Sequence, residues 1–154
     1  MNYKIPGTLS IALAFMAIGI ACFQLLEHSL LIGLLYIFAT PLLFLNTLFR
    51  YCRKCPHAVD GTCRHIVFGK IVYFLFKSIQ PSPYKVWESL SVAVSIGSVF
   101  IFPQYWLIKN PFRFVLFWVI MLSSITTIRF MVCPSCRNVY CRFCQKSPGN
   151  ATGN

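Results

Sequence analysis

Four apolar segments, each close to the length of a membrane-spanning helix, constrain this chain more than any other feature. They cover approximately residues 7–26, 29–49, 86–108 and 111–132, and they carry few or no charged side chains. A helix needs about 20 apolar residues to cross a bilayer. Because backbone N–H and C=O groups inside a membrane must pair within the protein, such segments become helices. The sequence therefore predicts an all-α integral membrane protein, with residues 1–154 as a single membrane domain.

The overall composition agrees with this interpretation. Hydrophobic residues make up 57% of the chain, and charged residues make up 11%. A soluble domain normally contains about 25% charged residues. The low charge content therefore argues against a soluble globular domain.

The basic residues predict how the chain is oriented. With four spans, both termini and both groups of clustered cysteines lie on one face of the membrane. That face carries twelve of the 14 Lys and Arg residues, and the opposite face carries only Lys109 and Arg113. The face rich in short-loop Lys and Arg is normally cytoplasmic. We therefore expect a multi-pass protein of the cytoplasmic (inner) membrane, with its termini and cysteine clusters on the cytoplasmic side.

The net charge of +11 also bears on partners. In a soluble protein such a charge would suggest nucleic acid. Here the basic residues lie just outside apolar spans, where they meet lipid headgroups. The expected partner is therefore a bilayer with anionic headgroups and not nucleic acid.

The cysteines form two clusters with one spacing. Cys52, Cys55 and Cys63 recur 81 positions later as Cys133, Cys136 and Cys144, and each set follows a pair of spans. Two halves in the same orientation are typical of a parallel repeat, related by an axis along the membrane normal. The sequence thus predicts two helix-pair repeats, each followed by a cytoplasmic cysteine knuckle.

Three shorter segments complete the predicted organisation: a cysteine loop at 50–65, an amphipathic helix at 66–80 and a cysteine tail at 133–146. The helix is too short to span a bilayer comfortably, so it is expected to lie in the membrane interface. The alternative is a core helix packed under the cytoplasmic loop. The residue types do not distinguish these two positions.

Two features of the later spans predict local structure. Pro103 is expected to kink the third span near its outer end, because proline cannot continue the helical hydrogen bonds. Ser91, Ser95, Ser123 and Ser124 are small residues that allow helices to approach closely. They favour helix packing over a transport path.

The clustered cysteines indicate a metal site. Cytosolic thiols are normally reduced, so a disulfide framework is not expected. Cys133, Cys136, Cys141 and Cys144 form a complete set of four thiolates for zinc or for an iron–sulfur cluster. The first cluster has only three cysteines, because Asp60 occupies the position that matches Cys141.

The first cluster therefore needs a fourth ligand, and His57, His65 and Asp60 are candidates beside the second cluster itself. Seven cysteines and one histidine would complete two four-coordinate sites. Each cluster could hold its own metal. Alternatively, Cys52 and Cys55 could join Cys133 and Cys136 in one site, and the sequence leaves both partitions open.

The cysteine motifs also carry a resemblance. The first runs from Cys52 through Cys55, Pro56 and His57 to Cys63, and the second contains Cys133, Cys136, Asn138 and Cys141. In these two segments the chain resembles uncharacterised small four-helix membrane proteins of microbes, which have a CxxCP…C loop and a cysteine-rich C-terminal tail. Cys144 is an addition to that pattern. The resemblance implies an architecture and no activity.

These observations predict a metal-binding scaffold or accessory subunit of a membrane complex, with structural zinc and with a membrane protein partner or a second copy of the chain. One alternative is an iron–sulfur subunit for electron transfer. Another is a thiol oxidoreductase, which the CPSC motif at Cys133 suggests. No catalytic constellation is evident, so the prediction leans away from an enzyme.

Overall fold

Four long helices dominate the computed structural model, which describes residues 4–59, 66–76, 80 and 82–135. The first two are α1 (Lys4–His28) and α2 (Leu30–Arg50). The third span is divided between α5 (Val86–Ile101) and α6 (Gln104–Leu107). The fourth consists of α7 (Pro111–Thr127) and its π-helical continuation η2 (Ile128–Val132). All four are long and apolar enough to cross a membrane, and no strand occurs in the described residues, so the predicted all-α multi-pass class is confirmed.

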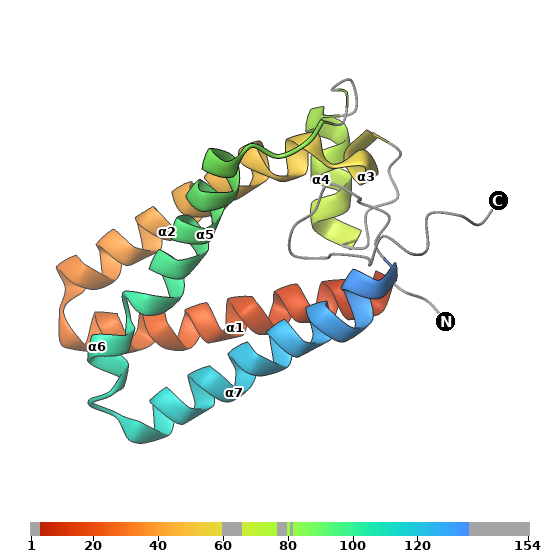
Figure 1. Cartoon of the computed structure of the whole chain (residues 1–154). Helices are drawn as coiled ribbons and strands as arrows, with labels where there is room; N and C mark the ends of the chain where they lie inside the picture. Colours follow the sequence, from red (N-terminus) through yellow and green to blue (C-terminus); the bar gives the residue numbers. More distant parts are fainter. Residues whose placement is uncertain (1–3, 60–65, 77–79, 81, 136–154) are drawn as a thin grey trace.

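Short helices lie between and after these spans. They are η1 (Cys52–Lys54), α3 (Pro56–Val59), α4 (Ile66–Phe76) and η3 (Cys133–Ser135). The start of α1, the end of η2, α3 and α4 all lie at one end of the molecule, which we call the cysteine-bearing end (Figure 1). The turn between α1 and α2 lies at the opposite end with α6.

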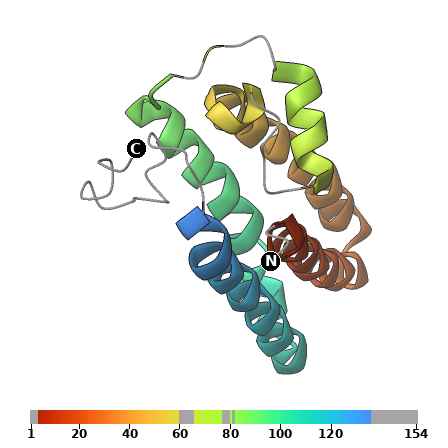
Figure 2. The same ribbon diagram turned by 90° about the vertical axis from the view of Figure 1, so that its right-hand side faces the viewer.

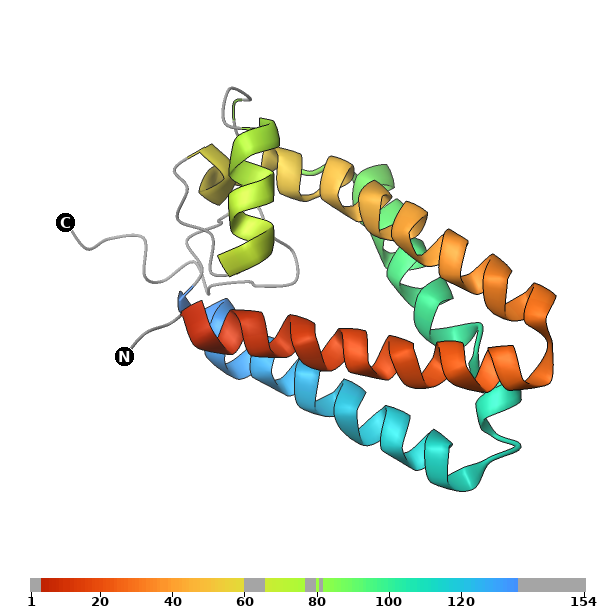
Figure 3. The ribbon, with the colours of Figure 1, turned by 180° about the vertical axis from the view of Figure 1, so that it is seen from behind.

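The spans pack as two pairs. Helix α1 lies along α7, and α2 crosses α5, while α1 and α2 form a hairpin. The two pairs diverge toward the cysteine-bearing end, and α4 lies across that end (Figure 3). A two-fold relation between the halves would exchange the α1–α7 contact with the α2–α5 contact. Among the described residues, however, α5 and α7 do not pack along their length as α1 and α2 do, so the packing does not show the predicted repeat.

Close approach in the α1–α2 hairpin depends on a glycine. Only Ser29, in an extended conformation, separates the two helices. A Cβ atom on Gly33 would come within 3.0 Å of the Cα atom of Leu26 and closer still to its side chain. Any larger residue at position 33 would therefore push the helices apart.

Small residues also let α1 approach α7. Ser10, Ala17 and Ala21 on α1 are fully buried, and Phe117 and Met121 of α7 are buried in the same region. Between membrane helices, packing and hydrogen bonds provide most of the attraction, because lipid tails are as apolar as the side chains. The Ser124 hydroxyl of α7 adds a hydrogen bond to the Ser10 carbonyl, at 2.7 Å.

A side-chain hydrogen bond network joins α2 to α5. The Asn46 side-chain amide donates to the hydroxyls of Ser91, at 3.0 Å, and Ser95, at 2.8 Å. The predicted role of these serines in helix packing is therefore confirmed. An amide inside a span would be costly without such partners.

The predicted kink at Pro103 is confirmed, because α5 ends at Ile101 and α6 begins at Gln104. In a continuous helix the N–H of residue 103 would donate to the Val99 carbonyl, but proline has no N–H. The Tyr36 hydroxyl of α2 donates to that carbonyl instead, at 2.7 Å. The Gln104 side chain in turn donates to the Phe100 carbonyl, at 2.6 Å. Side chains thus supply the hydrogen bonds that the kink removes.

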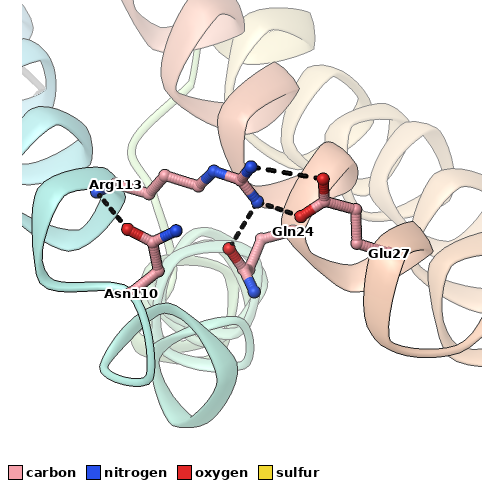
Figure 4. Close-up of polar contacts among 4 residues, drawn as sticks. All are labelled: Gln24, Glu27, Asn110 and Arg113. Carbon is pink, nitrogen blue, oxygen red and sulfur yellow. Dashed lines mark hydrogen bonds and ion pairs between the residues drawn. The ribbon is translucent and has the colours of Figure 1, made fainter.

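An ion pair joins α1 to α7 at the end opposite the cysteine-bearing end (Figure 4). The Arg113 guanidinium donates to both carboxylate oxygens of Glu27 and to the Gln24 side-chain carbonyl. The Asn110 side chain accepts the Arg113 backbone N–H at 3.3 Å and so caps α7. Arg113 therefore fixes the start of α7 against the end of α1.

The segment predicted as an amphipathic helix is partly confirmed. Helix α4 covers Ile66–Phe76, and the segment from 77 to 79 lies outside the described residues. Val72 and Phe76 are buried, and Phe76 packs edge-to-face on Phe49 of α2, beside which α4 lies (Figure 2). Phe74 on another side of α4 is 78% exposed. The helix therefore has one face in the core and one apolar face exposed, which combines features of both predicted positions.

We predict that Tyr36→Phe destabilises the protein by about 1 kcal/mol, because the Val99 carbonyl loses its donor inside the bundle. Unfolding in detergent, titrated with a denaturing surfactant, measures this loss. In a Pro103→Ala background the residue 103 N–H becomes available to Val99, so Tyr36→Phe should cost less there. An equal cost in both backgrounds would show that the hydroxyl does not compensate for the proline.

Candidate functional site

The described cysteines outside the spans lie at the cysteine-bearing end, as the sequence predicts. Cys52 begins η1 directly after α2, and Cys133 begins η3 directly after η2 (Figure 1). Cys55 follows η1, and His57 lies in α3. The other predicted ligands, Cys63, His65, Cys136, Cys141 and Cys144, lie outside the described residues, as does Asp60.

A tight turn brings Cys52 and Cys55 together. The Cys55 N–H donates to the Cys52 carbonyl at 3.1 Å, so the C-x2-C segment forms one 3₁₀ turn. Both side chains are half-buried against an apolar cluster that includes Leu48, Val72 and Phe76. Helix α4 therefore shields the first cysteine pair from one side.

His57 lies close by in sequence and is only 8% exposed. The described chemistry of the first cluster is thus two thiols and one imidazole, a donor set that suits zinc. However, no group of three His, Cys, Asp or Glu side chains converges within the described part of the chain. A four-coordinate site here would need donors from the segment that follows α3.

Cys133 differs from the expectation that the clustered cysteines are reduced. It is bonded in a disulfide, whereas Cys22, Cys52 and Cys55 carry thiols. The other described cysteines are not its partner. A cysteine in a disulfide does not ligate a metal, because the thiolate is the ligand.

The two clusters have separate surroundings. The η1 turn packs on α2, α3 and α4, whereas η3 packs on η2. Among the described residues, η1 and η3 do not pack on each other as they do on these helices. Both predicted partitions of the ligands stay predictions, because Cys136 and the other remaining ligands lie outside the described residues.

Three contacts that were not predicted from the sequence hold the η1 turn against the start of α5. The Lys54 ammonium lies 2.7 Å from the Glu88 carboxylate, which also accepts the Lys85 N–H at 2.8 Å. The rings of Tyr51 and Tyr84 stack with centroids 4.2 Å apart. The Tyr84 hydroxyl also donates to the Tyr51 carbonyl, at 3.1 Å.

Glu88 gave the only sequence signal for these contacts. The chain has three acidic residues, so an acid in the first turn of an apolar span invites a search for a basic partner. Twelve basic residues on that face left the partner undetermined. The tyrosine pair had no comparable signal, because its members are 33 positions apart.

Comparison of the chain with protein-family models, with curated proteins and with solved structures finds no match. The resemblance to small four-helix membrane proteins of microbes stays a prediction. The interpretation of the site therefore rests on its own residues and contacts.

We predict that Cys133 in protein purified without reductant reacts with an alkylating reagent only after reduction. Cys52 and Cys55 should react without reduction once the protein is denatured, because they carry thiols. Alkylation before and after reduction, followed by peptide mass mapping, measures both. Labelling of Cys133 in the unreduced, denatured sample would contradict the disulfide.

Proposed function

We propose that this multi-pass membrane protein binds a metal ion, most simply zinc, at its cysteine-bearing end. The ion would act structurally, and the protein would serve as a scaffold or accessory subunit of a membrane complex. The observation that supports this most is the position of the C-x2-C turn of Cys52 and Cys55. It directly follows a spanning helix, is half-buried and lies close in sequence to the buried His57.

A structural role agrees with the surroundings of that turn. Thiolates and imidazoles that bind zinc convert binding energy into folding energy. The Lys54–Glu88 ion pair and the Tyr51–Tyr84 stack already attach the turn to α5. A metal ion would fix the loop that follows α3 to the same point. The ligands proposed for this ion are Cys52, Cys55, Cys63 and either His57 or His65.

The disulfide at Cys133 favours a second candidate, thiol–disulfide chemistry in the tail. Reduction of this disulfide would take up two electrons and two protons from a thiol reductant and release two cysteine thiols. The released thiols could then bind a second metal ion in the tail, so this second site and the disulfide exclude each other at any one moment. An iron–sulfur cluster on the same thiolates, for electron transfer, is the further alternative.

For orientation, we propose that the cysteine-bearing end faces the cytoplasm. Arg50, Arg53, Lys54, Lys70 and Lys85 lie at this end in the described residues, and Lys109 and Arg113 lie at the other. Such a bias is typical of the cytoplasmic side. A reducing cytoplasm would keep most of these cysteines available as ligands.

Metal analysis of anaerobically purified protein tests the proposed function. We expect about one zinc ion per chain, without visible absorption, while the Cys133 disulfide is intact, and about two after its reduction, when eight ligands can complete two four-coordinate sites. Cys55→Ser should lower the zinc content, whereas the matched variant Cys22→Ser, in α1, should not. Iron together with sulfide in place of zinc would identify electron transfer as the function. Metal-free protein with redox-titrating thiols would favour dithiol chemistry.

Labelling in intact cells tests the orientation. Lys85 and Lys109 are both exposed, at opposite ends of the molecule. A membrane-impermeant maleimide should therefore add label to Lys109→Cys but not to Lys85→Cys. After cell lysis both variants should take up the same amount of label. The reverse pattern would place the cysteine-bearing end outside.

A further inference from the structure

We propose that α2 and α5 form a binding site for one anionic phospholipid at the cysteine-bearing end. This proposal does not depend on metal binding. A cavity of about 300 Å³ lies where α2 ends and α5 begins. Arg50, Arg53, Lys54, Ser82 and Glu88 are among the residues that line it. Together with Phe49, these charged and polar side chains line a chamber at the border of the spanning segments.

The charges of this cavity suit a phosphate. The Glu88 carboxylate is neutralised by Lys54 at 2.7 Å, so it leaves little net negative charge there. Arg50 and Arg53 are exposed, and neither forms an ion pair with a described residue. Guanidinium groups bind phosphate oxygens through two parallel hydrogen bonds. The two arginines thus line a chamber in which the one described acidic residue, Glu88, is already paired with Lys54.

An apolar groove adjoins this chamber. A second cavity, of about 530 Å³, is lined by Trp87, Leu90 and Val94 along α5, together with Arg50. Arg50 therefore borders both cavities. The Ser91 and Ser95 hydroxyls that also line the groove already accept hydrogen bonds from Asn46. The groove thus follows α5 into the apolar span, where an acyl chain would lie.

The combination of a charged chamber with an adjoining apolar groove favours a phospholipid over other anions. A free phosphate would meet the charged side chains of the chamber and gain nothing from the groove. Trp87 is 78% exposed at the start of α5, and tryptophan is enriched at the depth of lipid headgroups. A zwitterionic lipid would fill the groove but would lack the net negative charge that Arg50 and Arg53 favour. The geometry therefore fits a headgroup phosphate with its acyl chain beside Val94.

Native mass spectrometry of detergent-purified protein, titrated with phosphatidylglycerol or phosphatidylcholine, tests this site. Phosphatidylglycerol should bind in preference. Arg50→Gln and Arg53→Gln should each weaken its binding about fivefold, the effect expected for one basic residue near an anionic headgroup. Lys70 is a basic residue that is exposed on α4 and lies outside both cavities. Lys70→Gln is therefore the matched control, and it should bind phosphatidylglycerol as the unchanged protein does. Equal loss in all three variants, or no preference between the lipids, would overturn the proposal.

A second pair of variants tests the groove. Val94→Phe fills part of it and should weaken phosphatidylglycerol binding, whereas Val119→Phe, on the exposed surface of α7, should not. Both valines are similarly exposed, at 59% and 55%, so nonspecific loosening of the fold would affect both variants. Inorganic phosphate should not displace the lipid. Displacement by phosphate, together with binding unaffected by Val94→Phe, would show a free-anion site instead.

Discussion

The whole arrangement depends on one constraint, that backbone polar groups inside a membrane must find partners within the protein. The described residues satisfy this constraint by forming helices almost throughout. The constraint is most visible where a helix is interrupted. Pro103 removes a donor, and the Tyr36 hydroxyl replaces it at the Val99 carbonyl. Because Tyr36 belongs to α2, the repair of α5 is also a contact between helices. A break in one helix thereby positions its neighbour.

The other polar contacts position helices in the same way. Asn46 joins α2 to Ser91 and Ser95 of α5, and Ser124 joins α7 to α1. Ion pairs act at the two ends, with Arg113 and Glu27 at one end and Lys54 with Glu88 at the other. The second ion pair holds the turn of Cys52 and Cys55 beside the cavity that Arg50 and Arg53 line. The proposed metal and lipid sites therefore share one anchored segment of chain.

The sequence predicted the spans well, because length and apolar content decide them almost alone. It also predicted the kink at Pro103 and the packing role of Ser91, since each follows from a property of one residue type. It could not find the partners, such as Tyr36 for Val99 or Tyr84 for Tyr51, because these depend on which helices become neighbours. The disulfide at Cys133 was missed for a different reason. The expected reducing environment concerns the compartment, whereas bond formation also depends on how close two sulfur atoms lie.

The predicted 81-residue repeat can be compared with the packing residue by residue. The two halves would share the contact pattern only if corresponding positions allowed the same approach. Gly33, which lets α2 lie against Leu26 of α1, corresponds to Phe114 in α7. A phenylalanine at that position does not leave the space that Gly33 leaves for a neighbouring helix. The proposed lipid cavity lies between α2 and α5, where helices from different halves meet. A site of this kind depends on the assembled pair of halves and could not form within either one alone.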